Sequence, residues 1–172
     1  MAYKFFIKIL YRLYLLIVDC RSPIFDKLRG YIVKRLTNTP LTYTVNIFSG
    51  VFFEGTDKLK LGDHVSINQD CFISAYGGLE IGNYVSIAHR TSILTTEHLF
   101  SDQKIPIKNQ LVSYTPVVIG NNVWIGANVT VLAGIQIADG VIIGAGAIVT
   151  KSILEENTIY AGNPAKFIKT RF

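Results

Sequence analysis

The sequence predicts an all-β fold, a parallel β-helix solenoid built from six-residue repeats. Within residues 117–153 a β-branched aliphatic residue recurs every six positions, as Ile119, Ile125, Val131, Ile137, Ile143 and Val149. Residues that tolerate a left-handed backbone stand three positions beyond the first five of these, as Asn122, Asn128, Gly134, Gly140 and Gly146. Neither a helix nor a period-2 strand has this repeat. A coil that turns a corner every six residues does, and it stacks its aliphatic side chains inward.

The same register recurs upstream, which extends the predicted β-helix over residues 41–155. Aliphatic residues keep the spacing of six in two groups, Leu61, Ile67 and Ile73, then Ile81, Ile87 and Ile93. Two extra residues around Tyr76-Gly77-Gly78 indicate a bulged corner between the groups. The register is lost over 94–116, where polar residues and two prolines predict a loop that projects from the solenoid. A long loop in a compact fold is usually functional or disordered.

Bulk composition fits one cytoplasmic domain. The chain has 172 residues, 49% of them hydrophobic, and a modest net charge of +5. It lacks a basic run interleaved with aromatic residues, so we expect no nucleic-acid partner. Its two cysteines, Cys20 and Cys71, are far apart in sequence, which favours a reducing compartment over a disulfide framework. Cys71 occupies an inward-facing repeat position, so we expect a buried structural thiol.

Residues 1–40 are predicted to form an N-terminal helical segment. Residues 1–18 are strongly apolar, but Lys4, Lys8 and Arg12 recur every four positions and share one helical face. This stretch is shorter than the roughly twenty residues that span a bilayer. It packs on the solenoid end or a partner subunit, or lies as a basic amphipathic helix on the inner membrane surface. The need of a solenoid for an end cap favours the first alternative. Residues 156–172 form a C-terminal extension.

The three histidines are the main candidates for acid–base chemistry. His64 and His89 fall on or beside predicted corners, where a structural role is expected. His98 lies where the solenoid gives way to the loop, at the rim of a rigid scaffold, where catalytic groups tend to sit. Its imidazole suits proton transfer near neutral pH. The glycines of Ile143–Ala147 keep the six-residue corner phase, so we assign them to the solenoid rather than to a phosphate loop.

Three stretches together resemble the hexapeptide-repeat acyltransferases, in the branch of galactoside and maltose acetyltransferases and polysaccharide O-acetyltransferases. They are Val118–Gly126, Ile143–Lys151 and Ala161–Ala165. The resemblance covers roughly residues 61–169. It implies a left-handed parallel β-helix, a homotrimer, and acetyl transfer from acetyl-CoA to a hydroxyl or an amine.

The resemblance also implies site residues. The catalytic histidine of the family, just before the protruding loop, matches His98, and its acceptor-site asparagine matches Asn68. Its coenzyme A contacts match Trp124, Ala127, Ala145, Thr150, Lys151 and Lys169. No metal is expected. Ala75 and Tyr76 replace the acidic residues with which the galactoside branch binds its acceptor, and the helical N-terminus looks more like that of the polysaccharide O-acetyltransferases.

The sequence thus predicts an acetyl-CoA-dependent O-acetyltransferase that acts on a sugar or glycan in surface polysaccharide synthesis. It would work in the cytoplasm, including the inner face of the membrane. One alternative is an N-acetyltransferase acting on a nucleotide-linked amino sugar. Others are a β-helical carbonic anhydrase, whose three zinc-binding histidines have other spacings, and a non-catalytic scaffold. The sequence leaves open the acceptor, the role of the N-terminal helix and the group that orients His98.

Overall fold

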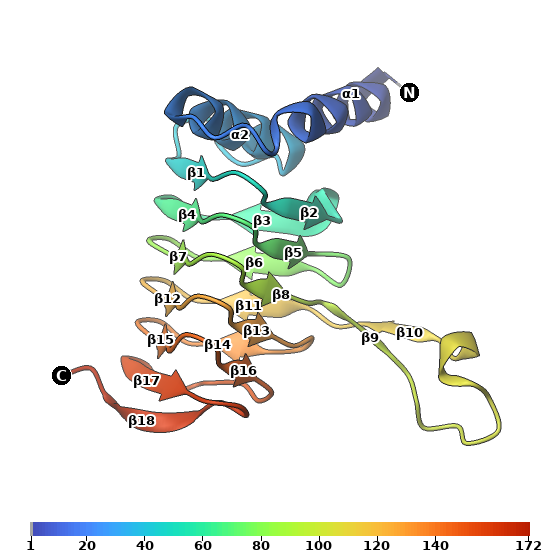
Figure 1. Cartoon of the computed structure of the whole chain (residues 1–172), viewed down its shortest axis with the longest axis vertical. Helices are drawn as coiled ribbons and strands as arrows, with labels where there is room; N and C mark the ends of the chain where they lie inside the picture. Colours follow the sequence, from blue (N-terminus) through green and yellow to red (C-terminus); the bar gives the residue numbers. More distant parts are fainter. Residues whose placement is uncertain (1) are drawn as a thin grey trace.

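The computed structural model describes residues 2–172, and the side chains from residue 6 onward. Met1 and the side chain of Lys4, which belong to the predicted basic helix, lie outside the described residues. The chain forms a triangular solenoid with two helices lying across its N-terminal end and a hairpin arm that projects from its side (Figure 1). The C-terminal strands close the other end.

The two helices that cap the solenoid are α1 (Ala2–Ile17) and α2 (Pro23–Leu36). Pro23 begins α2 at a position that needs no backbone donor, and Thr37 ends it by donating through Oγ1 to the Val33 carbonyl at 2.9 Å. The buried Arg29 joins the cap to the first coil, because it donates to the carbonyls of Ile17, Cys20 and Ile47. Neither helix is long and apolar enough to cross a membrane, and this holds for residues 2–172 as a whole.

The first face of the solenoid is a seven-stranded sheet. Its strands, in order, are β1 (Val45–Ile47), β4 (Val65–Ile67), β7 (Ser86–Ile87), β12 (Trp124–Ile125), β15 (Ile142–Ile143), β17 (Thr158–Ala161) and β18 (Lys166–Thr170). All neighbours are parallel except β18, which runs antiparallel to β17. Residues 156–172, predicted as an extension, therefore add two strands to this face.

The second and third faces are parallel throughout. The second face holds β2 (Phe52–Glu54), β5 (Phe72–Ser74), β8 (Ser92–Ile93), β13 (Thr130–Val131) and β16 (Ile148–Val149). The third holds β3 (Leu59–Leu61), β6 (Leu79–Ile81), β11 (Val117–Ile119) and β14 (Gln136–Ile137). Short 3-10 turns lie at Thr56–Lys58 and Ile107–Asn109.

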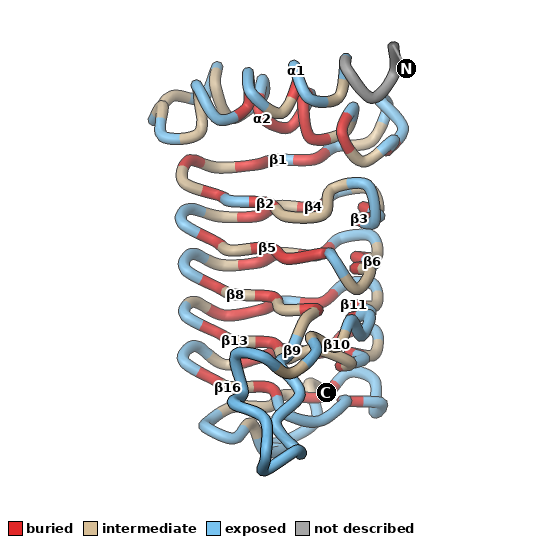
Figure 2. Tube along the Cα trace, turned by 90° about the vertical axis from the view of Figure 1, so that its right-hand side faces the viewer, coloured by how far each residue is buried: buried red, intermediate tan, exposed pale blue. Residues whose placement is uncertain are grey.

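The predicted register of six is confirmed by the pairing of the strands. Ile67 pairs with Ile87, Ile87 with Ile125, and Ile125 with Ile143, and all four side chains are buried. The inward aliphatic residues form one continuous core from the helical cap to the last coil (Figure 2). The five predicted corner residues have φ values between 55° and 80°. His64, which lies on or beside a predicted corner, also adopts a left-handed backbone, and so do Asp70, Tyr84 and Arg90, which the sequence did not indicate.

Residues 94–116 leave the solenoid after β8 and return at β11, as expected, but they are not a simple loop. They form an arm whose stem is an antiparallel pair, β9 (Thr96–His98) and β10 (Val112–Tyr114). The stem projects away from the coils (Figure 1). The sequence did not predict these two strands, because the stretch is polar and neither strand keeps the six-residue spacing of aliphatic residues.

Candidate active site

His98 is the last residue of β9, the outgoing strand of the arm's stem. Its backbone pairs with Val112 of β10, and its side chain is exposed. The buried Thr95 fixes the base of the arm, because its Oγ1 donates to the Ser74 carbonyl at 3.0 Å and accepts from Gly77 N at 2.9 Å. His98 is therefore presented to solvent on a hydrogen-bonded stem rather than on a free loop.

Asp102, four residues after His98, makes its hydrogen bonds within the arm. Its Oδ1 accepts from the backbone amide of Lys104 at 2.8 Å, and its own carbonyl accepts from the side chain of Gln110 at 2.9 Å. These bonds shape the tip of the arm.

Asn68 lies on a different edge of the solenoid, which we call the first corner. It follows β4, and its Nδ2 donates to the Ile87 carbonyl in the next coil at 2.9 Å. The first corner joins the first and second faces. One column of residues along it stands two positions after the last inward aliphatic residue of each first-face strand. They are Ser49, Gln69, His89, Ala127 and Ala145. The column thus passes from polar side chains near the cap to small ones near the C-terminal end.

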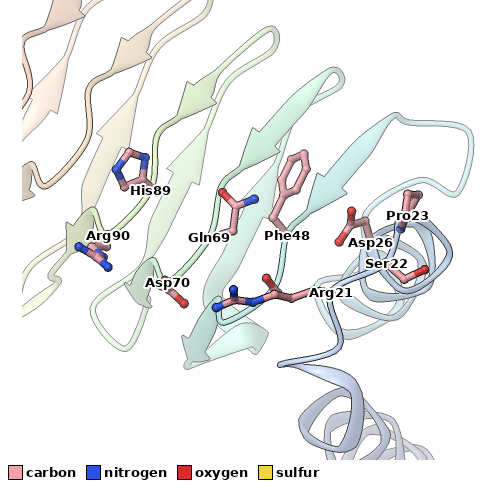
Figure 3. Close-up of a pocket in the computed structure, with 10 residues that line it drawn as sticks. Arg21, Ser22, Pro23, Asp26, Phe48, Gln69, Asp70, His89 and Arg90 are labelled. Carbon is pink, nitrogen blue, oxygen red and sulfur yellow. The ribbon is translucent and has the colours of Figure 1, made fainter.

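A cleft of about 590 Å³ lies at the first corner, beneath the helical cap (Figure 3). Gln69, Asp70, His89 and Arg90 line it from the solenoid, and Arg21, Ser22, Pro23 and Asp26 close it from the cap. The sequence did not predict this cleft. The repeat register carried a signal, because Gln69 and His89 share the corner phase of Ala127 and Ala145, but nothing in the repeats indicated that the cap overhangs them.

The predicted coenzyme contacts are spread over two faces of one chain. Trp124 is 53% exposed on the first face and lines a cleft of about 350 Å³ that Tyr84, Ile142 and Arg171 also line. Lys169 on β18 pairs with Ile159 of β17, which in turn pairs with Ile142, so it belongs to the same face. Ala127 and Ala145 lie on the first corner. Thr150 and Lys151 follow β16 on the second face and are exposed.

The structure of one chain does not bring all of the predicted residues together. Asn68 lies at the first corner, before the second face, whereas His98 lies on the arm, after it. The strands of the second face therefore lie between Asn68 and His98 along the coil.

The thiol of Cys71 is held in the core, as expected. The residue is 1% exposed, and its Sγ lies 3.1 Å from the Ala88 carbonyl. Burial raises the pKa of the Cys71 thiol to about 11, so the side chain is a neutral thiol at physiological pH. This position offers no thiolate nucleophile.

Two acidic residues on another edge of the solenoid are structural. Hydrogen bonds from the backbone amides of Thr44 and His64 lower the pKa of Asp63, and the side chain and amide of Asn121 do the same for Asp139. The carboxylates of Asp63 and Asp139 thus accept hydrogen bonds from the preceding coil and hold neighbouring coils together.

The three histidines lie in three different places. The ring of His64 lies against that of Tyr84 in a tilted arrangement with centroids 4.7 Å apart, His89 lines the first-corner cleft, and His98 is on the arm. Within residues 2–172 no group of three or more His, Cys, Asp or Glu side chains is placed to hold a metal ion.

Known proteins share both the repeat and the whole fold. The family model described as "Bacterial transferase hexapeptide (six repeats)" matches residues 116–151. A maltose O-acetyltransferase from Clostridium difficile is 30% identical and superposes with a TM-score of 0.79, over 96% of this chain and 84% of that one. The chain belongs to the hexapeptide-repeat acyltransferases. The predicted left-handed parallel β-helix is confirmed by these structural relatives.

Two further members of the family show how far the similarity reaches. A galactoside acetyltransferase solved in complex with coenzyme A is 27% identical with a TM-score of 0.76, over 94% of this chain and 78% of that one. A "probable acetyltransferase" of Mycobacterium tuberculosis is 37% identical over 114 residues, which are 66% of this chain. The match spans only 38% of the length of that curated relative.

Proposed function

We propose that this hexapeptide-repeat protein transfers an acetyl group from acetyl-CoA to a hydroxyl of a sugar in surface polysaccharide synthesis. The observation that carries the proposal is the similarity to a maltose O-acetyltransferase over 96% of the chain. The position of His98, exposed on the stem of the arm, supports it, because a sugar hydroxyl needs a base before it can attack a thioester.

The chemistry is a direct transfer with His98 as general base. The imidazole takes the proton of the acceptor hydroxyl as its oxygen forms a bond to the thioester carbonyl carbon. The carbon–sulfur bond then breaks, and coenzyme A leaves as the thiol by taking that proton from the His98 imidazolium, which returns the imidazole to its neutral form. Cys71 is buried as a neutral thiol, so this route does not pass through an acetyl group on that residue.

The acceptor sugar would occupy the first-corner cleft next to Asn68. Its lining residues Gln69, Asp70 and Arg90 offer donors and acceptors of the kind that bind sugar hydroxyls. The helical cap narrows the cleft from one end. Replacing Gln69 with Ala should raise the KM for the acceptor and leave that for acetyl-CoA unchanged.

The coenzyme would run toward the C-terminal end from the same corner. A pantetheine arm is a thin amide chain, and the small side chains of Ala127 and Ala145 leave room for it along the corner. The indole of Trp124 would line this path. Thr150, Lys151 and Lys169 would contact the phosphate-bearing end of the coenzyme, because lysine side chains bind phosphates.

The site would be completed in a homotrimer. Straight solenoid faces pack around a three-fold axis, and such a closed arrangement places the arm of one chain against the corner of the next. His98 and Asn68 would then meet across a subunit boundary.

The decisive assay follows release of free coenzyme A thiol from acetyl-CoA over a panel of acceptors. The panel contains neutral sugars, glycan fragments and a nucleotide-linked amino sugar, and mass spectrometry locates the acetyl group on each product. We expect release that depends on a sugar acceptor and an ester-linked product. Transfer only to the amino group would overturn O-acetylation, and binding of acetyl-CoA without transfer to any acceptor would favour a scaffold.

A further inference from the structure

The outward side of the helical cap carries exposed apolar residues that the proposed reaction does not use. The most exposed are Leu16 of α1 at 76% and Ile24 of α2 at 75%, and Phe6, Ile9, Leu13, Leu28 and Tyr31 accompany them. The opposite side of α1 packs on the first coil through Leu10 and Tyr14. Figure 2 shows exposed residues on the outer side of both helices, at the end of the molecule.

Basic residues flank this apolar surface. Lys8 and Arg12 are exposed on α1, which contains no acidic residue, and Lys27 and Arg35 are exposed on α2. Residues 1–40 contain eight basic and two acidic residues, whereas residues 41–172 contain nine and ten. The net positive charge of the chain therefore lies entirely in the cap.

We propose that the cap docks on an anionic lipid bilayer, with α1 lying along the membrane surface. A helix with exposed apolar residues and basic flanks binds at the headgroup boundary, where its cations meet anionic lipids. The 16 residues of α1 are too few to span the hydrocarbon core, so the helix lies in the interface.

The net positive charge of the cap favours an anionic membrane over a second copy of the chain as the binding partner. Two caps packed face to face would each bring a net charge of +6, and like charges across an interface disfavour association. An anionic bilayer covers the same apolar side chains and neutralises the cations.

The geometry of the solenoid also favours this docking. The helices lie across one end of the solenoid, perpendicular to its length (Figure 1). In the trimer proposed above, a three-fold axis along the solenoids would present three caps in one plane. Three weak sites bound to one surface reinforce each other.

The test is co-sedimentation of the full chain with vesicles. Wild-type protein should sediment with mixed phosphatidylcholine and phosphatidylglycerol vesicles, and much less with pure phosphatidylcholine. Replacing Lys8 and Arg12 together with Gln should weaken binding by about thirty-fold, since each basic residue near an anionic surface is worth about fivefold. Lys104→Gln with Lys108→Gln, on the arm, removes the same charge and should change binding little.

A fluorescence measurement separates insertion from simple charge attraction. In a Trp124→Phe background, Leu16→Trp places the only indole on the outward face of α1. Its emission should shift to shorter wavelength with anionic vesicles and stay constant without them. An unshifted emission, or wild-type protein that remains in the supernatant, overturns the proposal. Light scattering that shows end-to-end assemblies lost in Leu16→Asp would assign the face to a second copy instead.

Discussion

At the scale of single residues, Trp124 gives the most direct view of coenzyme binding. It is the only tryptophan of the chain and lies half exposed on the first face. Acetyl-CoA should change its fluorescence on saturation, because the coenzyme replaces water against the indole ring. Trp124→Phe should also weaken acetyl-CoA binding in calorimetry. Fluorescence that stays constant at saturation would move the coenzyme path away from the first face.

Residue chemistry also explains which corners the sequence could predict. Asn122, Asn128 and the corner glycines were predictable because these residues tolerate a left-handed backbone. Tyr84 and Arg90 adopt the same backbone without such a preference. The stacking of the coils imposes this backbone conformation. The amide of Tyr84 donates to the Asp63 carbonyl, and the amide of Arg90 donates to the Gln69 carbonyl, both in the preceding coil. The left-handed backbone of Arg90, one of the residues that line the first-corner cleft, was therefore not predictable from its residue type.

At the scale of elements, the base of the arm is predicted to control catalysis. Thr95→Val keeps the shape of the side chain but leaves the Ser74 carbonyl and Gly77 amide without its hydroxyl. We expect a loss of about 1–3 kcal/mol in the free energy of unfolding. We also expect kcat to fall by about ten- to a hundredfold, because small displacements of a catalytic group are costly. Chemical denaturation and steady-state kinetics measure the two effects.

Thr91→Val is the matched control for this change. Thr91 is equally buried, and its hydroxyl donates to the Gly126 carbonyl and accepts from Val129 N, neither of which belongs to the base of the arm. It should lose similar stability and keep its kcat at a temperature where both proteins are folded. Equal kinetic losses in the two variants would mean that the arm base has no special role.

The elements that sequence reasoning missed are those without a six-residue period. The coils were predictable because each repeats the same inward aliphatic residue. The β9–β10 stem and the return of β18 along β17 are antiparallel pairs, which depend on which segments meet in space. The overhang of the cap above the first corner is likewise a tertiary fact, fixed by the bonds of Arg29 to Ile17 and Ile47.

For the assembled protein, we predict a trimer whose sites span two chains. Light scattering should give three chains per particle, and a monomer that persists on dilution would contradict this. A mixture of His98→Ala and Asn68→Ala, unfolded and refolded together, should regain about a quarter of wild-type activity, because random assembly pairs an intact His98 with an intact neighbouring Asn68 at that frequency. Each variant refolded alone is the control. An inactive mixture would place both residues in a single-chain site.

Steady-state kinetics of His98→Ala, measured beside His64→Ala and His89→Ala, decide whether His98 is the general base. Loss of the general base should lower turnover by roughly 10²–10⁴-fold. Acetyl-CoA binding should change little, and the other two variants should keep substantial turnover. Near wild-type turnover in His98→Ala would contradict the assignment of His98 as the general base. Loss of all turnover in His89→Ala alone would contradict it as well.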